Sequence, residues 1–197
     1  MNKQEKIDEY NAFFRKKPEK WASDERNKLA LDTIDTYLDG RQPLHVLDIG
    51  CGNGHTIQYL HPHWSLTIFY GLDLSDVGIE IAQKRGLNRA TFVTGFLGEM
   101  EFPVRFDVIV LLGVAEHFEN PLEELKKVKQ LLIPGGIVYI EVPNCIAYPE
   151  SRHEEGFRRI TVGNHQFEWH LYRKSWETIL KNAGFRIEAS IKGPRQQ

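Results

Sequence analysis

The fold is decided by nine residues at positions 46–54, which read Val46-Leu47-Asp48-Ile49-Gly50-Cys51-Gly52-Asn53-Gly54. A short apolar strand at residues 45–49 runs directly into this glycine-rich turn, and residues 56–60 after the turn read as helical. Glycine is needed there because the backbone must turn tightly and lie against a ligand, with no side chain between them. The stretch therefore predicts a ligand-binding loop at the carboxyl end of a buried strand.

The spacing of the glycines narrows the choice of ligand. Glycine occupies every second position from Gly50 to Gly54, whereas a dinucleotide fold needs its third glycine one place later, where this chain has His55. The spacing disfavours NAD. A glycine motif taken alone is also compatible with a purely structural turn.

Working outward, apolar strands alternate with amphipathic helices along the chain. The first forty residues read as two helices separated at Pro18. Apolar residues at helical spacing indicate later helices from residues 74, 121 and 176. Further strands are expected at residues 67–72, 91–94, 106–112, 137–142 and 185–191. Continuous apolar strands between such helices predict an α/β fold with a mostly parallel sheet covered on both faces. Residues 145–172 show little periodicity and are expected to form a loop or short insertion.

Composition indicates a soluble globular domain. The chain has 197 residues, of which 41% are hydrophobic and 26% charged, and its longest apolar run, residues 108–115, is too short to span a bilayer. Two cysteines, Cys51 and Cys145, provide neither a disulfide framework nor a thiolate metal cluster. With a net charge of −2, the chain has no overall positive charge that would favour binding of nucleic acid. We expect a cytoplasmic enzyme without membrane association.

A second acidic residue strengthens the prediction of a ligand site. Asp73 closes the second expected strand, where its carboxylate is able to accept both ribose hydroxyls of an adenosine or, alternatively, to cap the next helix. Ligands of open α/β sheets bind outside the carboxyl ends of the strands. The glycine loop and Asp73 together are therefore more specific than either feature alone.

At this point the sequence resembles the class I S-adenosylmethionine-dependent methyltransferases. The matching segments occur in the family's order over residues 44–191: the glycine loop, Gly71-Leu72-Asp73-Leu74-Ser75, Phe106-Asp107-Val108-Ile109, Ala115-Glu116-His117-Phe118, Leu132-Ile133-Pro134-Gly135-Gly136 and Ala183-Gly184-Phe185. The resemblance implies a Rossmann-like, doubly wound sheet of six to seven strands. It also implies a division into an N-terminal helical lid at residues 1–43 and a methyltransferase domain at residues 44–197. If a seventh strand is present, part of residues 166–172 is expected to supply it.

The resemblance also implies a set of cofactor-binding residues for S-adenosyl-L-methionine. The loop under the methionine part would comprise Asp48, Gly50, Cys51, Gly52 and Gly54. Asp73 would hold the ribose and Leu74 would pack on the adenine. The family often places an acidic residue after the third strand. This chain instead has Phe96 and Leu97 there, so their main chain would contact the adenine, unless Glu99 reaches back. The backbone of Gly113 would line the sulfonium pocket.

Methyl transfer from a sulfonium needs alignment, exclusion of water and, for some acceptors, a base. The candidate bases are Glu116, His117 and His165. Each also has a simpler interpretation, because Glu116 is equally explained as solvated, His117 as a structural residue of its loop, and His165 as part of a packed aromatic loop. Substrate contacts are assigned to Tyr10, Trp21 and Trp169, although packing of two helices explains the N-terminal aromatic residues as well.

Two other functions compete with methylation of O or N on a small-molecule acceptor. Small-RNA 3′-end 2′-O-methyltransferases hold a divalent metal with two carboxylates and two histidines, and Glu116, His117 and the segment from His165 to Trp169 look similar. The position of the first carboxylate is Gly113, so we expect no metal and consider nucleic acid an unlikely partner. The second competing function is that of a cofactor-binding regulator without catalysis. The sequence identifies neither the methyl acceptor nor the oligomeric state.

Overall fold

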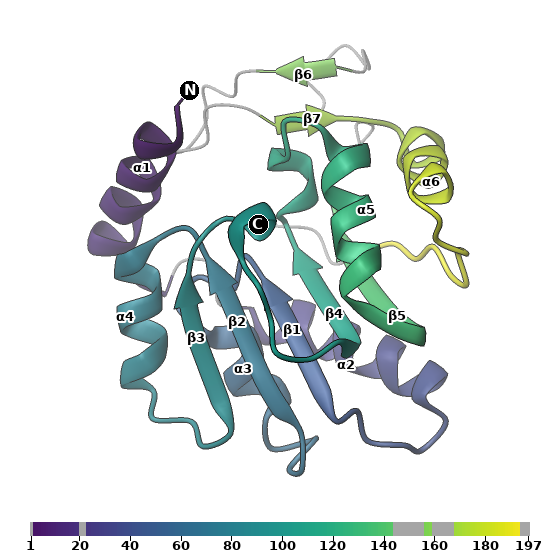
Figure 1. The fold of residues 1–197 in the computed structure, drawn as a ribbon, viewed down its shortest axis with the longest axis horizontal. Helices are drawn as coiled ribbons and strands as arrows, with labels where there is room; N and C mark the ends of the chain where they lie inside the picture. The colour runs from purple at the N-terminus through teal and green to yellow at the C-terminus, as the bar shows by residue number, and fades with distance from the viewer. Residues whose placement is uncertain (1, 20–22, 144–155, 159–167, 194–197) are drawn as a thin grey trace.

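The computed structural model describes residues 2–19, 23–143, 156–158 and 168–193. At its centre lies a parallel sheet of five strands in the order β3-β2-β1-β4-β5 (Figure 1). The strands are β1 (His45–Ile49), β2 (Ile68–Asp73), β3 (Ala90–Thr94), β4 (Phe106–Leu112) and β5 (Leu132–Glu141). All four pairs of neighbouring strands are parallel, so their carboxyl ends lie along one edge of the sheet.

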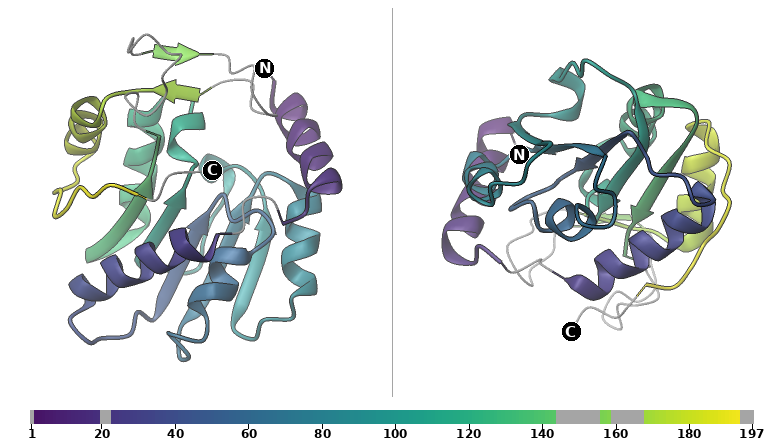
Figure 2. Two further views of the ribbon diagram at one scale, coloured as in Figure 1. Left: turned by 180° about the vertical axis from the view of Figure 1, so that it is seen from behind. Right: turned by 90° about the horizontal axis from the view of Figure 1, so that it is seen from below.

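Helices cover both faces of this sheet. One face packs against α2 (Asp24–Leu38), α3 (His55–Leu60) and α4 (Asp76–Lys84), which share a buried apolar cluster with β1, β2 and β4. The other face packs against α5 (Pro121–Leu131) and α6 (Arg173–Asn182) through a second cluster. Figure 2 shows α2 and α3 lying across the first face when the molecule is seen from behind. Two clusters form because the strands carry apolar side chains on both faces of the sheet.

Several elements gather at the carboxyl edge of the sheet. These are α1 (Lys3–Lys16), the short helices η1 (Leu97–Glu99) and η2 (Ala115–His117), and a separate antiparallel pair formed by β6 (Gly156–Arg158) and β7 (Glu168–His170). Figure 1 shows α1 at the upper left and the small sheet at the upper right, both beyond the carboxyl ends of the strands. The ends of α1 are locally encoded, since Asn2 and Glu5 form a capping box at its start and Pro18 follows its end.

The predicted fold class is confirmed, although the described residues place fewer strands in the main sheet than were predicted. The main sheet has five strands rather than six or seven within the described ranges. Residues 185–191 were predicted to form a last strand, and apolar residues do alternate in this segment. They have no ladder partner in this part of the chain, and Phe185 instead packs among α5 and α6. The segment Glu168–His170 pairs with β6 and not with the main sheet. Alternation specifies faces, whereas a strand also needs a neighbouring backbone edge.

The fifth strand also begins earlier than expected, at Leu132 rather than at residue 137, with a register irregularity opposite Phe106 and Val108. Among the described residues, no helix is both long enough and apolar enough to cross a membrane.

Candidate functional site

The glycine loop is held against the end of β2 by backbone hydrogen bonds. The amides of Gly50 and Cys51 both donate to the carbonyl of Leu72, at 2.7 and 3.1 Å. The amide of Gly54 donates to the carbonyl of Cys51 at 2.8 Å, which closes the turn before α3 begins. The predicted residues of this loop therefore lie at the carboxyl edge, between β1 and β2.

Gly52 is the point where the loop meets α1. Its φ of +50° is unfavourable for other residues, and an added Cβ would lie 2.7 Å from Cζ of Phe14. Phe14 is buried, so its ring has little room to move away. Only glycine satisfies both conditions at position 52, and α1 is consequently in direct contact with the loop.

Asp73 connects the loop to the next helix. One carboxylate oxygen accepts the amide of Gly52 at 2.8 Å, and the other accepts the amide of Ser75, the N-cap of α4, at 2.8 Å. Burial raises the pKa of Asp73, although the backbone amides of Ser75, Gly52 and Leu74 oppose that shift. A carboxylate has about four acceptor positions, so these two bonds leave capacity for a ligand hydroxyl.

A buried charge cluster lies at the ends of β1 and β5. Nε of Arg26, from α2, is 2.9 Å from Oε1 of Glu141, and the two side chains are 11% and 18% exposed. Asp48 lies buried nearby, one residue before the end of β1. Burial and then the charge of Asp73 raise the pKa of Asp48 well above its usual value, while Arg26 lowers it in part. Within the described chain, Nη2 of Arg26, Oδ2 of Asp48 and Oε2 of Glu141 are buried without a hydrogen-bond partner.

Gly113, in the loop after β4, lies next to this cluster. It has a φ of +69°, and a Cβ placed there would lie 3.3 Å from Nη2 of Arg26 and 3.5 Å from Oε1 of Glu116. Glu116 is buried in η2, and its Oε1 lies 4.0 Å from Nε2 of His117. The structure therefore brings two predicted bases, Glu116 and His117, to the same edge as the glycine loop.

Sequence reasoning missed Arg26 and Glu141. Arg26 lies four and eight residues before Ala30 and Ile34, which belong to the buried face of α2. A charged residue in line with a buried helix face is the signal in the sequence that points to Arg26. Glu141 ends a strand, as Asp73 does, and Asp48 lies one residue before the end of its own strand.

The residues predicted to contact the adenine lie on η1 and the loop after β2. Phe96 precedes η1, and Nζ of Lys3 lies 5.1 Å from the centre of its ring. Leu97 is partly buried in the cluster beneath α5, and Leu74 is half-buried. Glu99 is paired with Lys3 instead of reaching back toward the sheet.

The predicted substrate contacts come from two directions. Tyr10 is half-buried on α1. Trp169, on β7, donates its indole N–H to the carbonyl of Phe118 at 2.9 Å, which attaches the small sheet to the loop after η2. Trp21 and His165 lie outside the described residues. Within the described ranges, no group of three or more His, Cys, Asp or Glu side chains is arranged to hold a metal ion.

Residues 16–190 match the family model described as Methyltransferase domain. The chain is 27% identical over 124 residues to the ubiquinone biosynthesis O-methyltransferase of Leptothrix cholodnii, covering 60% of this chain and 52% of that protein. It is 29% identical over 122 residues to the trans-aconitate 2-methyltransferase of Rhodopseudomonas palustris, covering 61% and 46%. The chain thus spans about half the length of these two relatives.

Solved structures resemble the fold as well. The plantazolicin methyltransferase BpumL, in complex with a monoazolic desmethylPZN analog and SAH, is 25% identical with a TM-score of 0.61, covering 74% of this chain and 63% of that one. A methyltransferase from Mesorhizobium loti has a TM-score of 0.67 at 23% identity, covering 80% and 81%. The family resemblance drawn from the motifs is confirmed.

Proposed function

The chain belongs to the methyltransferase domain family, and from this premise we propose that it transfers a methyl group from S-adenosylmethionine to O or N of a small-molecule acceptor. The curated relatives support this proposal, since their names describe methylation of small molecules in ubiquinone biosynthesis and of trans-aconitate. The complex of BpumL with SAH, the demethylated form of the donor, supports the choice of cofactor.

The observation that carries the proposal is the set of buried, unpartnered polar atoms at the carboxyl edge. An amino acid ligand end has one carboxylate and one ammonium group. Nη2 of Arg26 would donate to the carboxylate, and Oδ2 of Asp48 would accept from the ammonium. Buried polar atoms are nearly always hydrogen-bonded in folded proteins, so orphaned atoms of both types fit the methionine end of the donor. Asp73 would accept the ribose hydroxyls.

The remaining predicted residues have complementary roles. When bound, S-adenosylmethionine supplies an activated methyl group for direct displacement by the acceptor. Gly113 leaves the space beside Arg26 and Glu116 free of a side chain. Glu116 and His117 are then the groups that would hold the acceptor or take its proton, because both lie on η2 at this edge.

The N-terminal region is proposed to act as the lid of this site. Residues 1–43 contain α1 and α2, and α1 contacts the glycine loop through Phe14. Residues 44–197 would form the rest of the methyltransferase domain, whose family match extends back to residue 16. Tyr10 on the lid and Trp169 on the opposite side would face the acceptor between them.

Titration calorimetry tests the proposal directly. S-adenosylmethionine and SAH should bind, and NAD should not. Asp73→Ala should weaken donor binding by about ten- to a hundredfold, because a hydrogen bond to a charged group contributes about 1.5–3 kcal/mol. The matched control is Asp107→Ala, since Asp107 accepts the amide of His45 at 2.9 Å at the amino end of the same sheet. Binding of NAD with no response to S-adenosylmethionine or SAH would contradict the proposal.

A further inference from the structure

Arg85, at the end of α4, joins three separate segments of the chain. Its Nε donates to the carbonyl of Asn53 in the glycine loop at 2.6 Å. Its Nη2 lies 2.9 and 3.1 Å from the two carboxylate oxygens of Glu19, and its Nη1 donates to Gln58 on α3. All three guanidinium nitrogens are therefore engaged, and the side chain is only 13% exposed.

Asn53 completes the same network from inside the loop. This buried residue donates its Nδ2 to the carbonyl of Pro18 at 2.6 Å and to Glu19 at 3.0 Å. Its Oδ1 accepts the amide of His55 at the start of α3. Pro18 and Glu19 belong to the segment that leaves α1, so one network fixes both the glycine loop and the base of the helix that lies on it.

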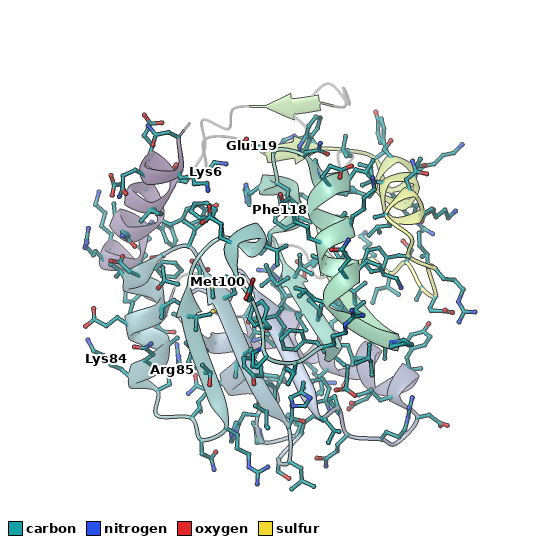
Figure 3. All side chains as sticks on the ribbon, in the orientation of Figure 1. Lys6, Lys84, Arg85, Met100, Phe118 and Glu119 are labelled. Atoms are coloured by element: carbon teal, nitrogen blue, oxygen red, sulfur yellow. The ribbon has the colours of Figure 1, made fainter. Side chains whose placement is uncertain are left out.

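The neighbouring residue shows that this arrangement is specific to Arg85. Lys84 pairs with Glu80 one turn earlier on α4, and both side chains are largely exposed, at 70% and 65%. Figure 3 shows Lys84 pointing away from the molecule while Arg85 turns inward. The pair of Lys84 and Glu80 is an ordinary surface ion pair of small energetic value.

The chemistry of the network requires a guanidinium group. A planar fork is able to donate to a carbonyl with Nε while two further donors engage a carboxylate, and lysine offers only a single point charge. The carbonyl of Asn53 lies between Gly52, which contacts Phe14 of α1, and the start of α3. A shift of Asn53 would therefore move the loop and disturb the seat of α1 at the same time.

We propose that Arg85 is a positioning residue for cofactor binding, which holds the glycine loop through Asn53 and the base of α1 through Glu19. This inference rests on the proposed function, because the loop is taken to bind S-adenosylmethionine. Arg85 acts without touching the cofactor. Its contribution is to keep loop and helix in the binding geometry before the ligand arrives, which lowers the cost of ordering them on binding.

The test compares Arg85→Ala, Arg85→Lys and Glu19→Gln with the control Lys84→Ala. Calorimetry at 25 °C gives the dissociation constant for S-adenosylmethionine, and hydrogen exchange of the ligand-free protein gives the protection of residues 50–55 and 3–16. Both Arg85 variants should weaken binding by about tenfold or more. Both should also lose protection in the two segments together. Glu19→Gln should affect α1 more than the loop, and Lys84→Ala should resemble the wild type.

The outcomes separate this inference from the proposed function. If the wild type does not bind S-adenosylmethionine, the proposed function fails. If the wild type binds but the Arg85 variants bind equally well, or if Arg85→Lys behaves as the wild type, only the positioning role is overturned. A lower unfolding midpoint with an unchanged dissociation constant would show a merely structural role. Should Arg85→Ala not fold, Arg85→Lys and Glu19→Gln decide the question.

Discussion

At the scale of single residues, the carboxyl edge is dominated by buried acids. Asp48, Asp73 and Glu116 are at most 9% exposed, and Arg26 is the cation placed among them. Removing a carboxylate from water disfavours its charged form, which explains why burial is the largest cause of the raised pKa of Asp48 and of Asp73. Burial of these acids lowers the stability of the ligand-free protein. The same acids favour binding of a ligand that carries positive charge.

Asp48→Asn tests this balance. Because the folded state raises the pKa of Asp48, it holds that proton more tightly than the unfolded chain. The wild type therefore loses stability as pH rises from the usual pKa through the raised one. The variant should melt about 2–4 °C higher than the wild type at pH 7–8, which corresponds to about 1 kcal/mol at this size. This difference should shrink toward pH 4, and donor binding should weaken. An advantage in melting temperature that is equal at both pH values would contradict the argument.

At the scale of elements, α1 is held more firmly near its carboxyl end, its base, than near its amino end, its tip. Near its base, Phe14 packs on Gly52, and Asn11 accepts the hydroxyl of Ser75 at 2.7 Å. At its tip, Nζ of Lys6 lies 2.6 Å from Oε1 of Glu119, which follows η2. Figure 3 labels both side chains. Lys6 lowers the pKa of Glu119 through its hydrogen bond and its charge. The tip contacts are solvent-accessible ion pairs, so they are the part of the helix most sensitive to salt.

Reversing this ion pair tests whether α1 acts as a lid. Lys6→Glu should weaken binding of S-adenosylmethionine about two- to fivefold at low salt, the size expected for an exposed pair. The double variant Lys6→Glu with Glu119→Lys should restore binding, and the effect should disappear at high salt. The same reversal of Lys126 and Glu123, an exposed pair on α5 at 2.8 Å, is the control. If the double variant is no better than Lys6→Glu, the pair does not hold α1 in place.

At the scale of the whole molecule, the fold leaves two enzyme functions to be distinguished. Methylation of a small molecule needs no metal, whereas methylation of an RNA 3′ end on the competing interpretation needs a divalent ion. Glu116 and His117 lie together on η2, and Gly113 stands where a further carboxylate would be needed. Arg26 approaches that position, which makes it unfavourable for a cation.

Chelation gives the corresponding prediction. EDTA should leave donor turnover in a metabolite extract unchanged, and added Mn²⁺ or Co²⁺ should not raise it. His117→Ala and His165→Ala should each lower turnover without creating sensitivity to the chelator. Loss of activity in EDTA that Mn²⁺ restores in the wild type, but in neither variant, would establish the metal-dependent alternative. The fold and the cofactor would still stand.

The sequence by itself determined the family, the parallel sheet and the positions of Asp48 and Asp73 at strand ends. These features depend on local patterns: apolar runs specify buried strands, and glycine spacing specifies the turn. The strand expected at residues 185–191 failed for the converse reason, because its pairing depends on an edge distant in the chain. Alternation carries no information about such an edge.

Only the tertiary structure decided which side chains meet at the site. Arg26 and Glu141 are 115 positions apart, yet they form one ion pair, and Glu19, Asn53 and Arg85 come together from three segments. No helical period encodes these partners, because each contact depends on how α2 and α4 pack on the sheet and on how α1 lies at its carboxyl edge. The sequence therefore predicted the glycine loop as the ligand-binding loop, and the packing of the helices determined which side chains surround it.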